Sequence, residues 1–363
     1  MIRILHVVTY MGRGGLETML MNYYRHIDHS KIQFDFLTHR QGHFEYDDEI
    51  EELGGKIYHL PKLNPFSISY RKELKRFFLS HKEYKIIHVH QDCMSSVVLK
   101  VAKECNVPVR IAHSHANSQD KNIKYPIKLF YKQFIPQYAT ELMACSKSAG
   151  DWMFDRAPYK VVKNAIDIDV YKFDEYKYAK MRKKLGVNDS EILIGHIGRF
   201  SPAKNHKFLI EVFNIIRHKV NAKLLLVGDG NLRQEIEKEI SELGLKGNVI
   251  LAGVQTDVSI YLQAMDVFVL PSLYEGLGIV AIEAQAAGIP CVISDRIPTE
   301  TIVSDSVEVM SLNDKKELWA DRIINLSKVQ KTDTSKLVRE AHYEISKNAE
   351  KLQTYYINAL QNL

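Results

Sequence analysis

Short apolar runs alternate with longer amphipathic segments from the first residue onward, and this alternation is typical of α/β proteins. In the first half of the chain, six apolar runs predict β-strands, at residues 2–9, 32–37, 56–60, 85–90, 109–113 and 141–144. The segments between them predict helices, which begin near Gly15, Tyr70, Cys93, Lys124 and Ser146. These elements predict one doubly wound parallel sheet.

A second series of the same kind occupies the rest of the chain. Its apolar runs predict strands at residues 191–197, 222–227, 248–251, 267–270 and 290–293. Its helices begin near His206, Leu232, Val258 and Ile279. The second half therefore predicts another open parallel sheet.

Two segments outside these series set the expected domain limits. The charged stretch 171–189 has little strand character and ends in turn residues, so we predict that it links the domains. Residues 334–362 carry apolar side chains at helical spacing and predict one long terminal helix. We expect an N-terminal domain over 1–170, a C-terminal domain over 171–340, and a segment 341–363 that packs back on the first domain.

Length and composition agree with two folded domains. With 363 residues, 45% of them hydrophobic, the chain can bury more apolar surface than one small domain holds. No apolar run approaches the ~20 residues that a membrane helix needs. Residues 1–9 indicate a buried strand and no signal peptide, so we expect a cytoplasmic protein. The cysteines at positions 93, 105, 145 and 291 form no CxxC pair and predict buried thiols.

Positive charge is concentrated in the first half of the chain. The net charge is +5, and residues 56–132 alone hold 15 Lys and Arg against 5 Asp and Glu. We expect something anionic beside this half. Residues 121–132 place Lys124, Lys128 and Lys132 on one helix face and interleave them with aromatic side chains. This pattern suits peripheral contact with an anionic membrane, although a solvated helix face is the more common case for such a segment. No nucleic-acid recognition motif accompanies the patch, so we expect no nucleic-acid partner.

Two glycine-rich turns follow predicted strands, where backbone amides can be aimed at an anion. The turn Gly12–Gly15 lacks the G-x-G-x-x-G pattern and the acidic residue that NAD binding needs, and a tight strand-to-helix turn would also explain its glycines. The turn 198–206 carries Arg199 and Lys204, a forked donor and a point charge that together suit a diphosphate. Either cation alone would be an ordinary surface residue.

The segment 271–290 carries the most specific pattern. Glu275 lies in a turn, and Glu283 lies about two turns along the helix that starts after Gly278. A carboxylate on a helix otherwise made of Ile, Val and Ala must be paired or must bind something, and the hydroxyls of a ribose or sugar are natural partners. A structural hydrogen-bond network around Glu283 is the alternative.

The spacing from Glu275 to Glu283 matches the E-x7-E motif of retaining glycosyltransferase family 4, and the surrounding S-x-x-E-G-x-G and E-A-x-A-x-G-x-P patterns resemble that family closely. The resemblance covers nearly the whole chain, with further family-like motifs at residues 14–17, 163–167, 198–205, 227–230 and 253–254. Residues 111–115, Ile-Ala-His-Ser-His, resemble the branch that builds capsular polysaccharides and exopolysaccharides. The chain departs from the family at Leu277, where Phe is usual, and at Ala165, where Gly is common.

The resemblance implies the GT-B fold, two Rossmann-like domains facing across a cleft, with the nucleotide sugar held by the C-terminal domain and the acceptor by the N-terminal one. It implies that Arg199 and Lys204 neutralise the donor diphosphate, that Glu283 holds the ribose and that Glu275 contacts the donor sugar. Further donor contacts are implied at Gly15, Gly253, Val254, Leu277, Gly278 and Ile279. No cofactor besides this donor substrate is implied.

Histidines lie at the ends of two predicted strands, as the pairs His88 with His90 and His113 with His115. Because side chains alternate along a strand, each pair points to one face. A metal site is conceivable, but the carboxylates and spacing of a dedicated site are absent, and the family is typically metal-independent, so we expect no metal. The resemblance places one histidine of the second pair beside the donor sugar, and we favour His113; a core histidine is the alternative.

Together these patterns predict a retaining, metal-independent hexosyltransferase. We expect it to move a sugar from a nucleotide diphosphate donor, with UDP favoured, to a hydroxyl of a glycan or lipid-linked glycan at the inner face of the membrane. Catalytic roles are expected for Glu275, His113, Arg199 and Lys204. No side chain stands out as a nucleophile, which fits a same-face mechanism in which the leaving diphosphate takes the acceptor proton. A non-hydrolysing nucleotide-sugar epimerase and a non-catalytic nucleotide-sugar sensor are the alternatives.

Overall fold

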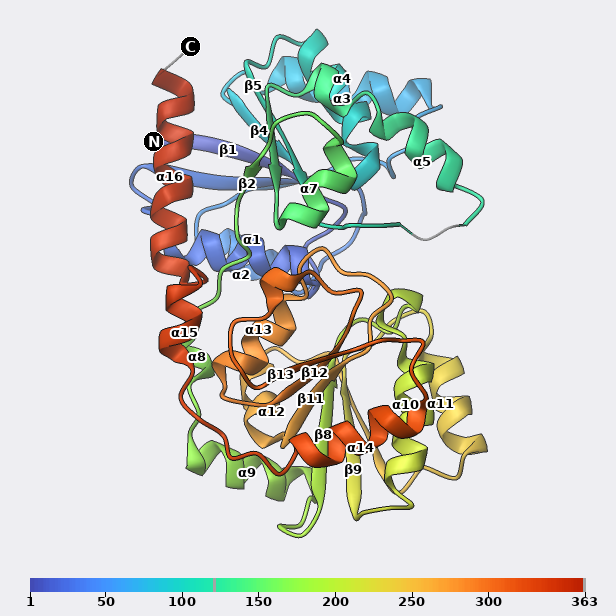
Figure 1. Ribbon diagram of the computed structural model, residues 1–363. Coiled ribbons are helices and arrows are strands. Elements are labelled where there is room, and N and C mark those ends of the chain that lie inside the picture. The colour runs from blue at the N-terminus through green and yellow to red at the C-terminus, as the bar shows by residue number, and fades with distance from the viewer. Residues whose placement is uncertain (120–121, 362–363) are drawn as a thin grey trace. The chain divides into compact units, whose positions relative to one another are not determined.

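The computed structural model describes residues 1–119 and 122–361 (Figure 1). The chain forms two compact units. Unit 1 comprises residues 1–165 and the C-terminal segment from residue 345, and unit 2 comprises residues 166–344. The sequence places the boundary at residues 170 and 171, a few residues inside unit 2.

Unit 1 is built on a parallel sheet of seven strands in the order β3-β2-β1-β4-β5-β6-β7. The six predicted strands are confirmed, as β1 (Ile2–Val7), β2 (Ile32–Thr38), β3 (Ile57–His59), β4 (Ile86–Val89), β5 (Val109–Ser114) and β6 (Glu141–Ala144). The sequence does not predict β7 (Lys160–Val161), because two exposed residues carry no apolar pattern. The strand order reverses between β1 and β4, and open sheets bind ligands beyond the carboxyl ends of strands at such a point.

Helices supply the crossover connections that parallel strands require. In unit 1 they are α1 (Gly15–His26), α2 (Asp47–Glu52), α3 (Ile68–Ser80), α4 (Ser95–Glu104), α5 (Tyr125–Lys132), α6 (Ile135–Tyr138) and α7 (Lys147–Phe154), with a 3₁₀ turn η1 (Asp92–Met94). The five predicted helix starts correspond to α1, α3, the η1–α4 segment, α5 and α7. Because α2 and α6 are only six and four residues long, they show no helical periodicity in the sequence.

Unit 2 is built on a parallel sheet of six strands in the order β10-β9-β8-β11-β12-β13. The strands are β8 (Ile192–Ile197), β9 (Ala222–Val227), β10 (Val249–Gly253), β11 (Val267–Leu270), β12 (Cys291–Ser294) and β13 (Val307–Met310), of which only β13 is not predicted. The helices are α8 (Ile168–Tyr171), α9 (Glu175–Leu185), α10 (His206–Ile216), α11 (Arg233–Glu242), α12 (Ser259–Ala264), α13 (Ile279–Ala286), α14 (Lys316–Leu326) and α15 (Ser335–Glu340), with 3₁₀ turns η2 (Pro202–Lys204) and η3 (Thr299–Thr301).

The predicted linker at residues 171–189 is wrong, because most of it is the helix α9 of unit 2. Asp174 caps the helix at its N-terminus, and Gly186 ends it in a left-handed conformation. Arg182 is only 3% exposed, and its Nη1 lies 2.8 Å from Oδ2 of Asp266. The same guanidinium donates to the backbone carbonyls of Asn188 and Glu191. A single buried arginine therefore fixes a helix whose charged surface resembles a linker in the sequence.

The predicted terminal helix is two helices, because the chain breaks between α15 and α16 (Ile345–Gln361). His342 in the break has a φ of 64°, which ends regular helix. Only α16 belongs to unit 1, where it packs against α1, and Figure 1 shows it beside β1 and β2. Its buried face carries Ile345, Ala349, Leu352 and Tyr356. The predicted return of the C-terminus to the first domain is confirmed.

Candidate functional site

In unit 2, the loops after β8, β9, β10 and β11 form one cluster at the carboxyl edge of the sheet. Backbone hydrogen bonds join them: Gly228 donates to Gly253 (2.8 Å), Phe200 to Asp229 (2.9 Å) and Leu273 to Ala203 (2.8 Å). A Cβ added at Gly228 would lie 2.2 Å from the carbonyl oxygen of Gly198, so only glycine fits there. The predicted donor-binding turns are therefore brought together and held close.

Lys204 and Glu275 contact each other across this cluster. The Lys204 Nζ lies 2.6 Å from Oε1 of Glu275, and Ser272 Oγ donates to the same oxygen at 2.6 Å. Both charged side chains are mostly buried. Asn205 Nδ2 donates to the carbonyl of Pro271 at 3.1 Å and so joins the loop that carries Lys204 to the loop that carries Glu275. Arg199 lies exposed on the same loop as Lys204.

Glu283 lies on the second turn of α13 and is 5% exposed. Burial raises the pKa of its carboxyl from 4.5 to about 7, against the opposing effects of a hydrogen bond from Tyr171 and the charge of Lys204. Lys204 is thus near both acidic residues of the motif. The contact with Tyr171 supplies part of the structural network that was the alternative for Glu283, and a carboxylate can accept further hydrogen bonds.

The N-terminus of α13 provides backbone donors beside these side chains. Gly278 precedes the helix with a φ of 82°, and within the described residues no side chain caps its first turn. The amides of Ile279 and Val280 at the start of α13 are therefore available to an anion, whereas the amide of Ala281 donates to the carbonyl of Gly278. Thr301 Oγ1 donates a hydrogen bond to the backbone carbonyl of Leu277, which is buried just before the helix. Gly253 has a φ of 70°, and Val254 after it is exposed.

Gly15, the remaining predicted phosphate contact, lies in unit 1. It is exposed and begins α1, and the described side chains provide no cap for this helix either. A Cβ at Gly12 would lie 2.4 Å from the Tyr10 ring, so packing explains part of this turn's glycine content. The structure thus leaves the amide of Gly15 at a helix N-terminus, where an anion can bind.

The two predicted histidine pairs of unit 1 are confirmed and come together. The rings of His88 and His90 stack with their centroids 4.3 Å apart, and those of His113 and His115 lie tilted with their centroids 4.1 Å apart. His90 Nδ1 lies 2.8 Å from Nε2 of His115, and His88 Nε2 lies 3.1 Å from Nδ1 of His113. His6 of β1 joins the cluster, with its Nδ1 3.1 Å from Nε2 of His90.

These imidazoles are neutral at physiological pH, because burial lowers the pKa of each of them, for His6 and His115 to about 3. Two groups of three histidines each bring one ring nitrogen per residue within 4.8 Å of the other two; they are His6 with His88 and His90, and His90 with His113 and His115. Neither group includes a carboxylate. Tyr356 Oη of α16 lies 2.7 Å from Nδ1 of His88. Among the described residues, His113 Nε2 and His115 Nδ1 have no hydrogen-bond partner, so either histidine can face a ligand.

Sequence reasoning missed two members of the histidine cluster, His6 and Tyr356, and assigned no role to Ser272, which begins the S-x-x-E-G-x-G pattern. A polar residue in the middle of a buried apolar strand was the available signal for His6. Nothing in the sequence connects Tyr356 with His88, because 268 residues separate them.

The basic stretch 121–132 includes α5, and Lys121 lies outside the described residues. Lys128 Nζ donates to Gln119 Oε1 at 2.5 Å, and Lys132 Nζ lies 4.5 Å from the centre of the Trp152 ring. Two lysines of the expected cationic face therefore contact other side chains of the same unit. Ile123 and Phe130 are 93% and 56% exposed instead. No described helix has the length and apolar character to span a membrane.

Comparison with known proteins identifies the family. The model described as Glycosyl transferases group 1 matches residues 177–351, and the model described as Glycosyltransferase Family 4 matches residues 13–170. A Bacillus subtilis (strain 168) protein named "Putative glycosyltransferase EpsF" is 35% identical over 335 residues, which cover 88% of this chain and 86% of the relative. The chain belongs to the glycosyltransferases of family 4.

Two further comparisons concern the whole length of this family 4 glycosyltransferase. An Escherichia coli relative, named UDP-Gal:alpha-D-GlcNAc-diphosphoundecaprenol alpha-1,3-galactosyltransferase, is 24% identical over 99% of this chain and 98% of its own. The crystal structure of Anabaena HepE, in complex with UDP and glucose, covers 100% of both chains with a TM-score of 0.81 and 19% identity. The structural likeness confirms the predicted GT-B class, with its two Rossmann-like parallel sheets.

Proposed function

We propose that this glycosyltransferase moves a hexose from a UDP-sugar to a hydroxyl of a lipid-linked glycan, with retention of configuration and without a metal ion, in the building of a cell-surface polysaccharide. The observation that carries the proposal is the cluster in unit 2. Lys204, Glu275 and Glu283 gather beside the uncapped N-terminus of α13. The Escherichia coli relative, whose name gives a UDP-sugar donor and a diphosphoundecaprenol acceptor, supports the choice of substrates.

The residues of this cluster suit a departing diphosphate. Arg199, Lys204 and the first amides of α13 place positive charge where negative charge develops as the bond from the sugar to the diphosphate breaks. The acceptor oxygen forms the new bond on the same face of the sugar, and its proton goes to the leaving diphosphate oxygen. These cations do the work that a metal does in other transferases.

The two carboxylates take different partners in this scheme. Glu283, buried along α13, accepts from the ribose hydroxyls, and Glu275 accepts from hydroxyls of the donor sugar once Lys204 turns to the diphosphate. Gly15 and His113 belong to unit 1, and their donor contacts stay predictions. At the inner face of the membrane, the exposed apolar side chains near α5 would meet the lipid surface together with neighbouring cations.

The test is nucleotide release from UDP-, GDP- and ADP-sugars, with and without a lipid extract as acceptor. Wild type is compared with Glu275→Ala and Lys204→Ala, and with Lys219→Ala, which removes an exposed ion pair to Asp321 as a matched control. We expect acceptor-stimulated release from a UDP-sugar that falls ~100-fold or more in the first two variants and stays unchanged in the third.

Other outcomes would support the alternatives. Isomerisation of the donor without any acceptor would indicate an epimerase, and binding without turnover would indicate a sensor. A sugar trapped covalently on the protein would contradict the same-face mechanism.

A further inference from the structure

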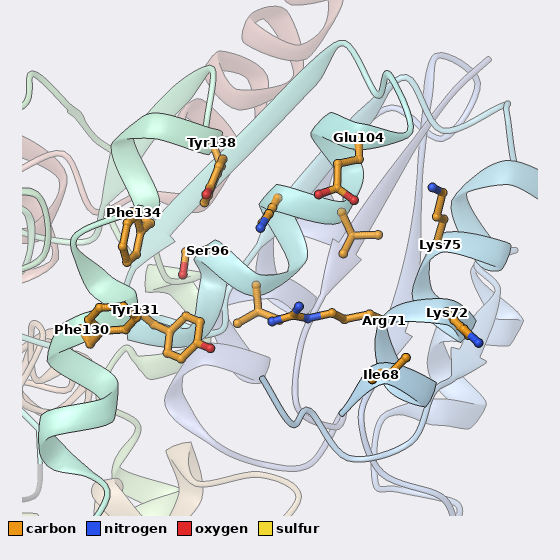
Figure 2. Close-up of a pocket in the computed structure, with 13 residues that line it drawn as sticks. Ile68, Arg71, Lys72, Lys75, Ser96, Glu104, Phe130, Tyr131, Phe134 and Tyr138 are labelled. Atoms are coloured by element: carbon orange, nitrogen blue, oxygen red, sulfur yellow. The ribbon is translucent and has the colours of Figure 1, made fainter. Parts of the chain in front are cut away.

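Unit 1 contains a cavity that none of the predicted donor-binding residues lines. Its volume is about 450 Å³, within the range of small-molecule sites, and it lies between α3, α4, α5 and α6 (Figure 2). One wall is basic and another is aromatic, with Phe130, Tyr131, Phe134 and Tyr138 on the side of α5 and α6.

The basic wall has an excess of uncompensated charge. Arg71, Lys72, Lys75 and Lys100 line the cavity against a single acid, Glu104. Within the described residues, none of these four cations forms an ion pair. Arg71 donates one N–H to the carbonyl of Pro65 at 2.7 Å, and the rest of its fork stays available. Unpaired cations gathered in one cavity favour an anionic occupant.

A buried hydroxyl gives an independent sign of a polar ligand. Ser96 is 1% exposed and lines the cavity, yet its Oγ has no hydrogen-bond partner among the described residues. A buried hydroxyl without a partner is costly, and an anion oxygen would satisfy it. Figure 2 shows Arg71 reaching across toward Tyr131, with Ser96 on the same side and Glu104 on the side of Lys75. A hydroxyl, a phenol and a guanidinium thus face one space.

Exposed apolar side chains accompany the cations of the cavity. Ile68 and Phe130 line it and are largely exposed. Exposed Phe66 lies edge-to-face with Tyr131, their ring centroids 6.4 Å apart. Large apolar side chains that gather at a charged cavity indicate a ligand with an apolar part. Inorganic phosphate has no apolar part that could contact these side chains.

We propose that this cavity binds the phosphate or diphosphate group of a lipid, with Arg71, Lys100 and Ser96 around the phosphate oxygens and the apolar chain along Phe130 and Ile68. The inference deepens the proposed function, since it places the lipid end of the acceptor on unit 1. Recognition of the lipid phosphate is then separate from recognition of the UDP-sugar by residues of unit 2.

The test is calorimetric titration of the full chain with farnesyl diphosphate, inorganic diphosphate, and phosphatidylglycerol vesicles. We expect farnesyl diphosphate to bind more tightly than inorganic diphosphate. The double variant Arg71→Gln/Lys100→Gln should bind it ~10-fold or more weakly, and Ser96→Ala several-fold more weakly. Arg76→Gln removes an exposed cation from the same helix outside the cavity and should bind like wild type.

Three results would overturn the proposal. The first is that the double variant binds farnesyl diphosphate as tightly as Arg76→Gln does. The second is that wild type binds farnesyl diphosphate and inorganic diphosphate with equal affinity. The third is that wild type binds the vesicles but not farnesyl diphosphate. UDP affinity, measured on the same variants, should stay unchanged because Lys204 and Glu275 belong to the other unit. Wild type that binds farnesyl diphosphate but not UDP would contradict the proposed function and support this site.

Discussion

The proposed donor-binding carboxylates of unit 2 each have a partner within the same unit. Lys204 pairs with Glu275, and Glu283 accepts a hydrogen bond from Tyr171. The sequence predicts which residues matter, because a lone carboxylate on an apolar helix demands a partner. It does not predict the Lys204–Glu275 pair, whose members are 71 residues apart. Such pairing keeps buried charges compensated, and under the proposed function donor binding would be an exchange of partners.

Replacing Glu283 with Gln should change how stability depends on pH. Because folding raises the pKa of this carboxyl from 4.5 to about 7, burial of its charge costs more as the pH rises between these values. We expect Glu283→Gln to match wild type near pH 5 and to be more stable by ~3 kcal/mol at pH 8. Urea unfolding at both pH values measures this. An equal difference at the two pH values would contradict the raised pKa.

The histidine cluster should make unit 1 sensitive to acid. Folding lowers the pKa of His6 from 6.5 to about 3, so its neutral form is favoured, and stability is lost as the pH falls below 6.5. At pH 5.5 this loss is ~1.4 kcal/mol for each such histidine. His6→Phe keeps the aromatic contacts with Phe34 and should show a shallower loss between pH 7.5 and 5.5 in urea unfolding. The exposed residue His218, changed to Asn, is the control, and identical pH slopes in both variants would contradict this account.

At the scale of elements, strands were easier to predict than charged helices. Parallel strands such as β1 and β8 are buried on both faces and show as continuous apolar runs, whereas β13 is half exposed and shows none. The stretch that forms α9 has a charged surface, and the one arginine that anchors it is indistinguishable in sequence from its neighbours. The sequence does not predict the break before α16, because the helical spacing of apolar residues continues across it.

Breaking the anchor of α9 should destabilise unit 2. Arg182→Ala leaves Asp266, which is partly buried, without its ion-pair partner and removes the donor to the backbone carbonyls of three residues, for an expected loss of ~3 kcal/mol or more. Chemical unfolding followed by circular dichroism measures this. Lys183→Ala, at the exposed neighbour, should cost less than ~0.5 kcal/mol. Equal losses in the two variants would show that Arg182 does not anchor the helix.

At the scale of the whole molecule, the two units are interleaved in sequence. Unit 1 consists of residues 1–165 and the segment from residue 345, so all of unit 2 lies between its parts. The core of unit 1 includes Ile345, Ala349, Leu352 and Tyr356 of α16 together with strands β1 and β2. The final helix is therefore a structural member of the first unit.

Removing core side chains of α16 should open unit 1 and spare unit 2. Leu352→Ala and Tyr356→Ala should each lose ~2–5 kcal/mol, because both side chains are buried. Limited proteolysis should then cut within residues 1–165 before residues 166–344. Lys351→Ala, at an exposed position of the same helix, is the control. Simultaneous cleavage of both units would contradict their independence.

The position of α16 after unit 2 in the sequence bears on how the protein is made. Domains of a growing chain generally fold in the order in which they leave the ribosome. Here the first unit to be synthesised lacks part of its core until α16 emerges, while unit 2 already has all of its residues. We therefore expect the order of completion to be reversed. We expect unit 2 to be complete before unit 1, and the core residues of unit 1 that α16 covers to be accessible to chaperones until α16 is synthesised.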